Sequence, residues 1–257
     1  MASIKQVVKQ LKKSLDDLQV EKAIELSENE AQTRMYLIEP FFEALLYNRS
    51  GVDGTLFPEY DADFGDRKSK KVDYAILLNG KKPDIIIEAK KVGLKLNDTH
   101  VRQLNEYFMY TTDSKIGILT NGTEYQFYTR VTGSKTGLNS KPFFVFDLAD
   151  YDSNSLDTLA LFYRTIIDIK KIQAEADEIY FLEKFEDAFV KELADPSRDF
   201  IKAIYSRMGG QRLTPQQEVS IKQLINSVSI KSALDRVIEK EAKSANSGII
   251  TTDEELK

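Results

Sequence analysis

The chain has 257 residues, of which 42% are hydrophobic and 30% charged, and its formal net charge is −5 at pH 7. This composition is typical of a globular protein with a sizeable core, either as one large domain or as a domain with an appendage. Because the chain contains no cysteine and one histidine, disulfides and Cys/His zinc sites are excluded, and Ser-His or Cys-His nucleophilic catalysis is implausible. Any catalysis must then use carboxylates, lysine, tyrosine or a bound hard metal ion.

No apolar run approaches the ~20 residues of a membrane span. The first residues alternate lysine with apolar side chains and do not form a signal-peptide core. We therefore expect a cytoplasmic protein without a membrane partner. The charge is unevenly distributed, because residues 66–95 carry nine basic and four acidic side chains, whereas residues 168–199 carry five basic and ten acidic ones. The basic side of the molecule should surround the first of these segments.

The N-terminal part predicts two helices and a loop. Residues 3–25 have apolar side chains at helical spacing, which predicts one amphipathic helix with Ser3 as its N-cap. A second helix begins near Ser27 or Asn29 and continues to Leu46, and Pro40 within it predicts a kink. Residues 48–70 are rich in Gly, Asp and Lys and predict a loop with a short strand around residues 56–60.

Residues 71–90, KVDYAILLNGKKPDIIIEAK, predict a β-hairpin. Asn79-Gly80 is a pair that accepts the two positive φ angles of a type I′ turn, and both flanking segments are apolar runs of strand length. With these two residues as the loop, Asp73 faces Ile86 and Lys71 faces Glu88.

The hairpin then has one apolar face and one charged face, because side chains alternate along a strand. The apolar face carries Val72, Tyr74, Ile76, Leu78, Pro83, Ile85, Ile87 and Ala89, and the other face carries Asp73, Asp84, Glu88 and Lys90. Two carboxylates diagonal to each other, with an ammonium group two residues beyond one of them, are the groups that hold a hard divalent cation and position a water. A turn of three residues would move Asp73 to the opposite face from Glu88.

After the hairpin, the sequence predicts a helix and three strands up to residue 147, and only helices from residue 155 onward. We expect a helix capped by Asp98 or Thr99, two strands over residues 115–120 and 124–130 joined by Asn121-Gly122, a loop over residues 132–142, and a buried strand over residues 143–147. Helices are predicted over residues 155–172, 176–194, 196–207 and 215–242, and the segment 243–257 is expected to be disordered.

These motifs resemble those of a known family. Val72-Asp73-Tyr74 followed by Ile85-Ile86-Ile87-Glu88-Ala89-Lys90-Lys91 resembles the D…ExK signature of the PD-(D/E)xK nuclease superfamily, in the form seen in the N-terminal nuclease domain of type I restriction enzyme R subunits. Neighbouring segments agree and extend the resemblance over residues 30–128. They are Glu30-Ala31-Gln32-Thr33-Arg34, Leu37-Ile38-Glu39-Pro40, Gln103-x-x-x-Tyr107 and Leu119-Thr120-Asn121-Gly122.

The resemblance implies an α/β fold with a restriction-endonuclease-like core, in which a mixed central sheet is flanked by helices. It implies a nuclease-like domain over residues 1–150, followed by an all-helical C-terminal region, residues 151–242, that we expect to serve oligomerisation or docking. The implied activity is metal-dependent endonucleolytic hydrolysis of DNA phosphodiester bonds. The alternative is a nucleic-acid-binding or assembly module that retains the fold without cutting.

The resemblance also implies roles for individual residues. Asp73, Glu88 and the carbonyl of Ala89 would ligate Mg²⁺, for which Mn²⁺ can substitute, and Lys90 would orient the attacking water. Glu30 would be the acidic residue of the leading helix, with Glu28 and Glu39 as alternatives. Asp84, in a literal Pro-Asp pair, is about 13 Å from Glu88 along one extended strand, too far to share an ion.

The expected substrate contacts come from a helix and from two lysines. The resemblance assigns them to Gln103, Tyr107, Lys71 and Lys91, although each of these residues also fits an ordinary packing or surface role. No base-reading motif is present, so we expect contacts to the DNA backbone. The chain has no G-x-x-x-x-G-K-[ST] phosphate loop, and we expect no use of ATP. The sequence leaves open DNA against RNA, strandedness and sequence preference.

Overall fold

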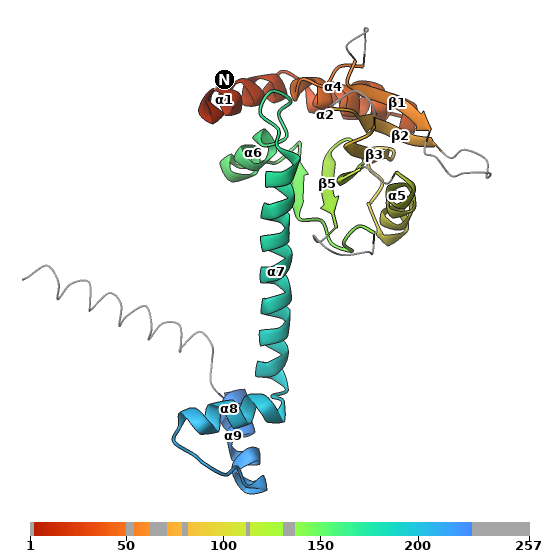
Figure 1. Cartoon of the computed structure of the whole chain (residues 1–257). Helices are drawn as coiled ribbons and strands as arrows, with labels where there is room; N and C mark the ends of the chain where they lie inside the picture. The colour runs from red at the N-terminus through yellow and green to blue at the C-terminus, as the bar shows by residue number, and fades with distance from the viewer. Residues whose placement is uncertain are drawn as a thin grey trace, which may run out of the picture. The chain divides into compact units, whose positions relative to one another are not determined.

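The computed structural model describes residues 3–49, 54–61, 71–78, 82–111, 114–130 and 137–227. The chain divides into two compact units, Met1–Phe181 and Leu182–Lys257. The first unit carries a mixed sheet with helices on both faces, and the second is helical where it is described (Figure 1). The predicted α/β class is therefore confirmed. The first unit continues beyond residue 150, where we place the end of the nuclease-like domain from the sequence, and that boundary stays a prediction.

The N-terminal helices are shorter than the sequence predicts. Residues 3–25 form α1 (Ile4–Asp16) and α2 (Val20–Glu25) instead of one helix. The interruption lies at Gln19, whose φ of 47° places it in the left-handed region that ends a right-handed helix. The expectation of one continuous helix was wrong because a helical pattern of apolar residues does not show a local break of this kind.

The second predicted helix contains a π-helical turn. Asn29 caps α3 (Glu30–Thr33), η1 follows over Arg34–Ile38, and α4 covers Glu39–Ala44. The N–H of Glu39 donates to the carbonyl of Arg34, five residues earlier. Proline lacks an N–H group, so Pro40 cannot continue an α-helical ladder, and the wider turn before it takes up the change. The distortion predicted at Pro40 is thus a π-turn that begins at Arg34.

The sheet has six strands in the order in which they occur in the chain. They are β1 (Leu56–Asp61), β2 (Lys71–Ile76), β3 (Ile85–Ala89), β4 (Ile116–Thr120), β5 (Glu124–Thr129) and β6 (Phe144–Asp147). Only the β3–β4 pair is parallel among them, and the connection between these two strands contains α5 (Asp98–Tyr110). Asn97 caps α5, with its side chain accepting from the N–H groups of Thr99 and His100, so the predicted cap at Asp98 or Thr99 was misplaced.

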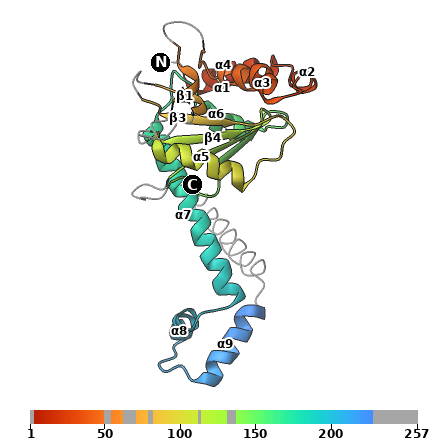
Figure 2. The ribbon, with the colours of Figure 1, turned by 90° about the vertical axis from the view of Figure 1, so that its right-hand side faces the viewer.

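Helices cover both faces of this sheet. One buried cluster joins the sheet to α1, α4 and α6 (Ser153–Ala160), and a second cluster joins the other face to α5. Figure 2 shows α5 and the N-terminal helices on opposite sides of the strands. All five residues of β3 and all five of β4 are buried, as expected for central strands with two covered faces.

The hairpin register differs from the predicted one by two residues. Tyr74 pairs with Ile87 and Ile76 with Ile85, and one further step along β2 brings Asp73 opposite Glu88. The carboxylate of Asp84 accepts the N–H of Leu78 at 2.9 Å, and the N–H of Asp84 donates to Ile76. The last paired residues are Ile76 and Ile85, so the connection between the two strands is longer than a two-residue loop. The predicted turn pair, Asn79-Gly80, lies outside the described residues.

The face assignment of the hairpin survives this correction, because a shift of two residues preserves side-chain alternation. Tyr74, Ile76, Ile85, Ile87 and Ala89 share the first cluster as predicted, whereas Val72 belongs to the second. The predicted charged face was only partly right. The apolar residues Ala75, Leu77 and Ile86 share this face and are buried under α5. Asp73 and Glu88 lie at one end of the paired strands, and Asp84 lies at the other end.

The C-terminal elements also differ from the sequence prediction. The strand β6, predicted to be buried, is an edge strand in which only Phe146 is buried. The predicted helix over residues 155–172 ends at Ala160, and α7 (Ile169–Ala194) begins after Asp168, whose carboxylate accepts the N–H groups of Lys170 and Lys171. In the second unit α8 covers Arg198–Arg207 and α9 covers Pro215–Ser227. The rest of the predicted last helix and the predicted disordered tail lie outside the described residues.

None of the helices in the described part of the chain has both the length and the apolar character needed to cross a membrane.

We expect Gly122→Ala to destabilise the first unit by about 2–4 kcal/mol, from left-handed strain and overpacking together. Gly122 has a φ of +89°, and an added Cβ would lie 2.9 Å from Cγ2 of Thr33 and 3.0 Å from Cβ of Leu37. Gly93→Ala is the matched control, because its φ is +79° but no atom lies within 4 Å of the added Cβ. Urea unfolding measures both, and equal losses would contradict the steric part of the expectation.

Candidate active site at the end of the central strands

Charged side chains from several elements meet where β3 ends. Asp73 comes from β2, Glu88 and Lys90 from β3 and the residue after it, and Glu30 and Arg34 from α3 and η1. The backbone N–H of Lys90 donates to the carbonyl of Thr120 at 2.8 Å. That bond extends the parallel pairing with β4 and fixes the direction in which Lys90 leaves the sheet.

Asp73 is held by two donors. Its Oδ2 accepts the backbone N–H of Ala89 at 2.7 Å, and its Oδ1 accepts Nη2 of Arg34 at 2.5 Å. The side chain is 17% exposed. Because the Ala89 donor belongs to the neighbouring strand, the carboxylate is tied to the same short segment that carries Glu88.

Glu88 and Lys90 form an ion pair that is almost closed to solvent. Nζ of Lys90 lies 2.6 Å from Oε1 of Glu88, and these side chains are 14% and 3% exposed. The same ammonium group donates to Oε1 of Gln103 on α5 at 3.2 Å. Lys90 is therefore positioned from both sides, by a carboxylate of its own strand and by an amide of the covering helix.

Burial and neighbouring charges raise the pKa values of both central carboxylates. Burial raises the pKa of Glu88 to about 7, and the negative charge of Asp73 adds to this effect while Lys90 opposes it. Burial also raises the pKa of Asp73, against the opposing effects of the Ala89 N–H and Arg34. Burial and the neighbouring charge of Asp73 thus both favour the protonated form of Glu88.

Among the three glutamates considered for the leading helix, Glu30 is the one beside the site. Its Oε1 accepts Nη2 of Arg34 at 2.6 Å, the same nitrogen that bonds Asp73. Glu39 instead accepts from Arg49 and from the hydroxyl of Tyr74. Glu28 is exposed. The geometry thus agrees with Glu30 over the two alternatives.

The donor atoms here suit a small hard cation. Mg²⁺ is usually bound by one or two carboxylates, with waters and a substrate phosphate completing its coordination, and Asp73 and Glu88 supply two carboxylates on adjacent strands. Within the described ranges, no three side chains among Asp, Glu, His and Cys are grouped as they would be around a metal ion. In this structure each acidic group of the site is paired with the cationic group of Arg34 or Lys90.

The four residues predicted to contact the substrate lie in different surroundings. Gln103 lies at the site through its bond to Lys90. Tyr107 is 9% exposed and packs in the cluster beneath α5, which favours the packing role over substrate contact. Lys71 and Lys91 are exposed, and Nζ of Lys71 lies 3.8 Å from Glu59. Among the described residues, no hydrogen bond or ion pair links either lysine to the acidic cluster.

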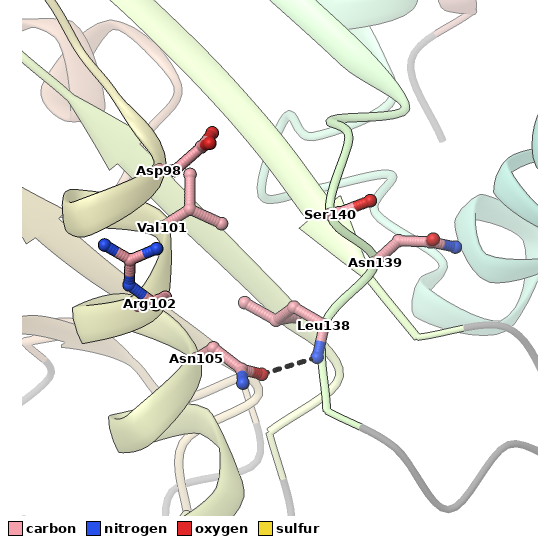
Figure 3. A pocket seen from close by; sticks show the side chains of 7 residues that line it. All are labelled: Asp98, Val101, Arg102, Asn105, Leu138, Asn139 and Ser140. Atoms are coloured by element: carbon pink, nitrogen blue, oxygen red, sulfur yellow. Dashed lines mark hydrogen bonds between the residues drawn. The ribbon is translucent and has the colours of Figure 1, made fainter.

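A separate cavity of about 290 Å³ lies between α5 and residues 138–140 (Figure 3). Its lining residues are Asp98, Val101, Arg102, Asn105, Leu138, Asn139 and Ser140. The side chain of Asn105 accepts the N–H of Leu138 at 2.7 Å across it. Since none of the acidic-site residues lines this cavity, it is distinct from the candidate active site.

Arg34 is the member of the site that sequence reasoning missed. It belongs to the quoted Glu30-Ala31-Gln32-Thr33-Arg34 motif and stands four residues after Glu30, a spacing at which helical side chains meet. That spacing indicates the pairing with Glu30. The contact with Asp73 joins residues 39 positions apart, which spacing alone does not indicate.

Comparison with known proteins identifies one family. Residues 29–141, somewhat less than half of the chain, match the family model described as "Type I restriction enzyme R protein N terminus (HSDR_N)". The predicted resemblance to the N-terminal domain of type I restriction enzyme R subunits is thereby confirmed, and the matched segment includes every member of the charged cluster. Neither the search of curated proteins nor that of solved structures returned a match.

We expect the contribution of Glu88 to the stability of the metal-free protein to fall as the pH rises from its ordinary pKa of 4.5 to about 7. The folded-state pKa of Glu88 is raised to about 7, so the folded state binds this proton more strongly than the unfolded chain does. Its stabilising contribution is complete below the unfolded pKa and is lost as the pH passes the folded pKa. The unfolding free energy of Glu88→Gln minus that of wild type should therefore increase by on the order of 2 kcal/mol between pH 4.5 and pH 8.

The measurement is urea unfolding of both proteins in the presence of a chelator, across this pH range. Glu124→Gln, a substitution of another partly buried glutamate outside the site, controls for general effects of losing one acidic charge. A difference between wild type and Glu88→Gln that does not change with pH would contradict the assignment of the raised pKa to Glu88.

Proposed function

We propose that this chain is a restriction-enzyme-like nuclease module that hydrolyses DNA phosphodiester bonds with Mg²⁺. The supporting observation is the convergence of Asp73, Glu88 and Lys90 at the end of two adjacent strands, within the segment that matches the restriction-enzyme family. Fold alone does not establish chemistry, and the argument therefore rests on what these three side chains do at their observed positions.

Asp73 and Glu88 are the groups that would hold the ion, together with the carbonyl of Ala89. When bound, Mg²⁺ supplies positive charge that polarises the phosphate and lowers the pKa of water. The protein's part is to present two carboxylates with little freedom to move. The bond from the Ala89 N–H to Asp73 and the burial of Glu88 do this.

Lys90 is the candidate for handling the nucleophile. Its ammonium group is anchored to Glu88 and Gln103, and it retains the capacity to donate one further hydrogen bond. That bond would orient a water toward the phosphorus atom, and the charge would stabilise the extra negative charge of the transition state. Gln103 acts through Lys90 and is therefore a positioning residue.

The DNA would be held by its backbone. Lys91 follows Lys90 directly and is exposed, and Lys71 is exposed at the start of β2. Further lysines of the basic stretch lie in segments 62–70 and 79–81, outside the described residues. Contacts of this kind neutralise phosphates and make binding strongly dependent on salt.

A non-cleaving nucleic-acid-binding or assembly module is the second candidate function. The observation that favours it is the pairing of each acidic group with Arg34 or Lys90, because such pairs also stabilise a fold without any bound ion. All the groups needed for cleavage are nevertheless present together, and we therefore place the enzyme first.

The role of the helical C-terminal region stays a prediction. Several large apolar side chains along α7 are exposed, among them Phe181, Leu182 and Phe185. Exposed apolar surface of this kind is common at sites of protein association. It is consistent with the expected oligomerisation or docking.

We expect Asp73→Asn and Lys90→Ala each to reduce DNA cleavage by about 10²–10³-fold, the usual loss when a charge-stabilising or proton-handling group is removed. The measurement is the rate of cleavage of supercoiled, linear and single-stranded DNA with Mg²⁺ or Mn²⁺. Asp84→Asn is the matched control and should keep most of the activity, because Asp84 bonds Leu78 at the other end of the hairpin.

Thermal unfolding should accompany these assays, since Asp73 has two bonded partners whose loss also affects stability. Two results would contradict the enzyme proposal. One is the absence of cleavage by wild type on all three substrates, and the other is cleavage that survives undiminished in both folded site variants.

A further inference from the structure

A single nitrogen of Arg34 bridges two acidic groups. Nη2 lies 2.6 Å from Oε1 of Glu30 and 2.5 Å from Oδ1 of Asp73. Since the Ala89 N–H already occupies Oδ2 of Asp73, both carboxylate oxygens have a donor. The two donors differ in one respect, because the N–H belongs to a central strand whereas the guanidinium is at the end of a long side chain.

The balance of local charge explains why the guanidinium of Arg34 lies between Glu30 and Asp73. Glu30, Asp73 and Glu88 carry three negative charges when ionised, and Arg34 and Lys90 supply two positive ones. Lys90 is taken up by Glu88 and Gln103, so Arg34 is the counter-charge shared by Asp73 and Glu30. Without it, Asp73, whose side chain is 17% exposed, would be left as a largely buried charge, which is costly.

The hold of Arg34 on the site is incomplete. Arginine binds a carboxylate most strongly through two parallel bonds, but here one nitrogen serves both partners. The buried Nε has no hydrogen-bond partner among the residues that the structure describes. Among the bonds that the structure describes, moving the guanidinium away therefore breaks only those of Nη2, and Nε has no partner to lose.

The helical segment that carries Arg34 is fixed independently. The hydroxyl of Thr33 accepts the N–H of Val92 at 3.0 Å, and Gly122 packs against Thr33 and Leu37. The π-turn begins at Arg34 itself, and turns of this type are frequent at functional sites. A rearrangement of Arg34 is thus a side-chain movement that leaves the backbone in place.

We propose that Arg34 is the resident cation of the acidic site, which takes the place of the divalent ion in the metal-free protein and leaves Asp73 when the ion binds. This inference rests on the proposed Mg²⁺ site and adds its regulation. Metal binding must compete with the bond from Arg34 to Asp73, so the apparent affinity is reduced to the share of molecules in which the guanidinium has left Asp73.

The test is calorimetric titration of the full chain with Mn²⁺, without DNA, for wild type, Arg34→Gln and Arg34→Lys. We expect Arg34→Gln to bind Mn²⁺ about tenfold more tightly than wild type, which corresponds to a resident state favoured about ten to one. Arg34→Lys should show a smaller gain, because lysine keeps the charge but lacks the planar fork of donors. This second variant carries the test if Arg34→Gln does not fold.

The melting temperature, measured with and without Mn²⁺, gives an independent test of the role of Arg34. The metal-free melting temperature of Arg34→Gln should lie below that of wild type, and saturating Mn²⁺ should raise it by more than it raises wild type. Arg49→Gln is the matched control, because Arg49 also pairs with a carboxylate that is 17% exposed, that of Glu39. It should leave the Mn²⁺ affinity unchanged.

The outcomes separate this inference from the proposed function. Equal Mn²⁺ affinities for wild type and Arg34→Gln overturn the role of Arg34 and leave the metal site standing. No binding by either protein overturns both. Tighter binding by Arg34→Gln supports the role of Arg34 even where wild type cleaves no DNA, in which case only the proposed cleavage fails.

Discussion

The charge balance around Asp73 and Glu88 is the constraint on which the rest of the site depends. Pairing of β2 with β3 brings two carboxylates to neighbouring positions with little access to water. Two adjacent negative charges of low exposure are unfavourable unless cations or hydrogen-bond donors accompany them. Arg34 supplies one positive charge from the N-terminal helical segment, and Lys90 supplies the other from the end of β3.

The same charges tie the covering helices to the sheet. Arg34 links η1 to β2, and Lys90 links β3 to α5 through Gln103. Uncharged contacts support this arrangement, since Thr33 accepts the N–H of Val92 and Gly122 allows close approach of the turn after β4. The acidic site is therefore also the point where helices from both faces of the sheet meet its central strands.

Sequence patterns predicted the strands well and the interruptions of helices poorly. Apolar runs bounded by turn residues located β1 to β6 within a residue or two, and side-chain alternation placed Asp73 and Glu88 on one face even though the register was displaced by two. The breaks at Gln19 and after Ala160 have weak local signals. Helix interruptions of this kind are set by packing against the rest of the fold, which propensity does not contain.

The sequence by itself determined the chemistry that is available: carboxylates and lysines without cysteine, an acidic residue on each of two strands, and motifs that resemble a restriction-enzyme domain. Only the tertiary structure decided which of these groups meet. It set Asp73 opposite Glu88, separated Asp84 from them and brought Glu30 to the arginine that also bonds Asp73. It also brought Arg34 to Asp73, because contacts between residues 39 positions apart depend on how helix and sheet pack together.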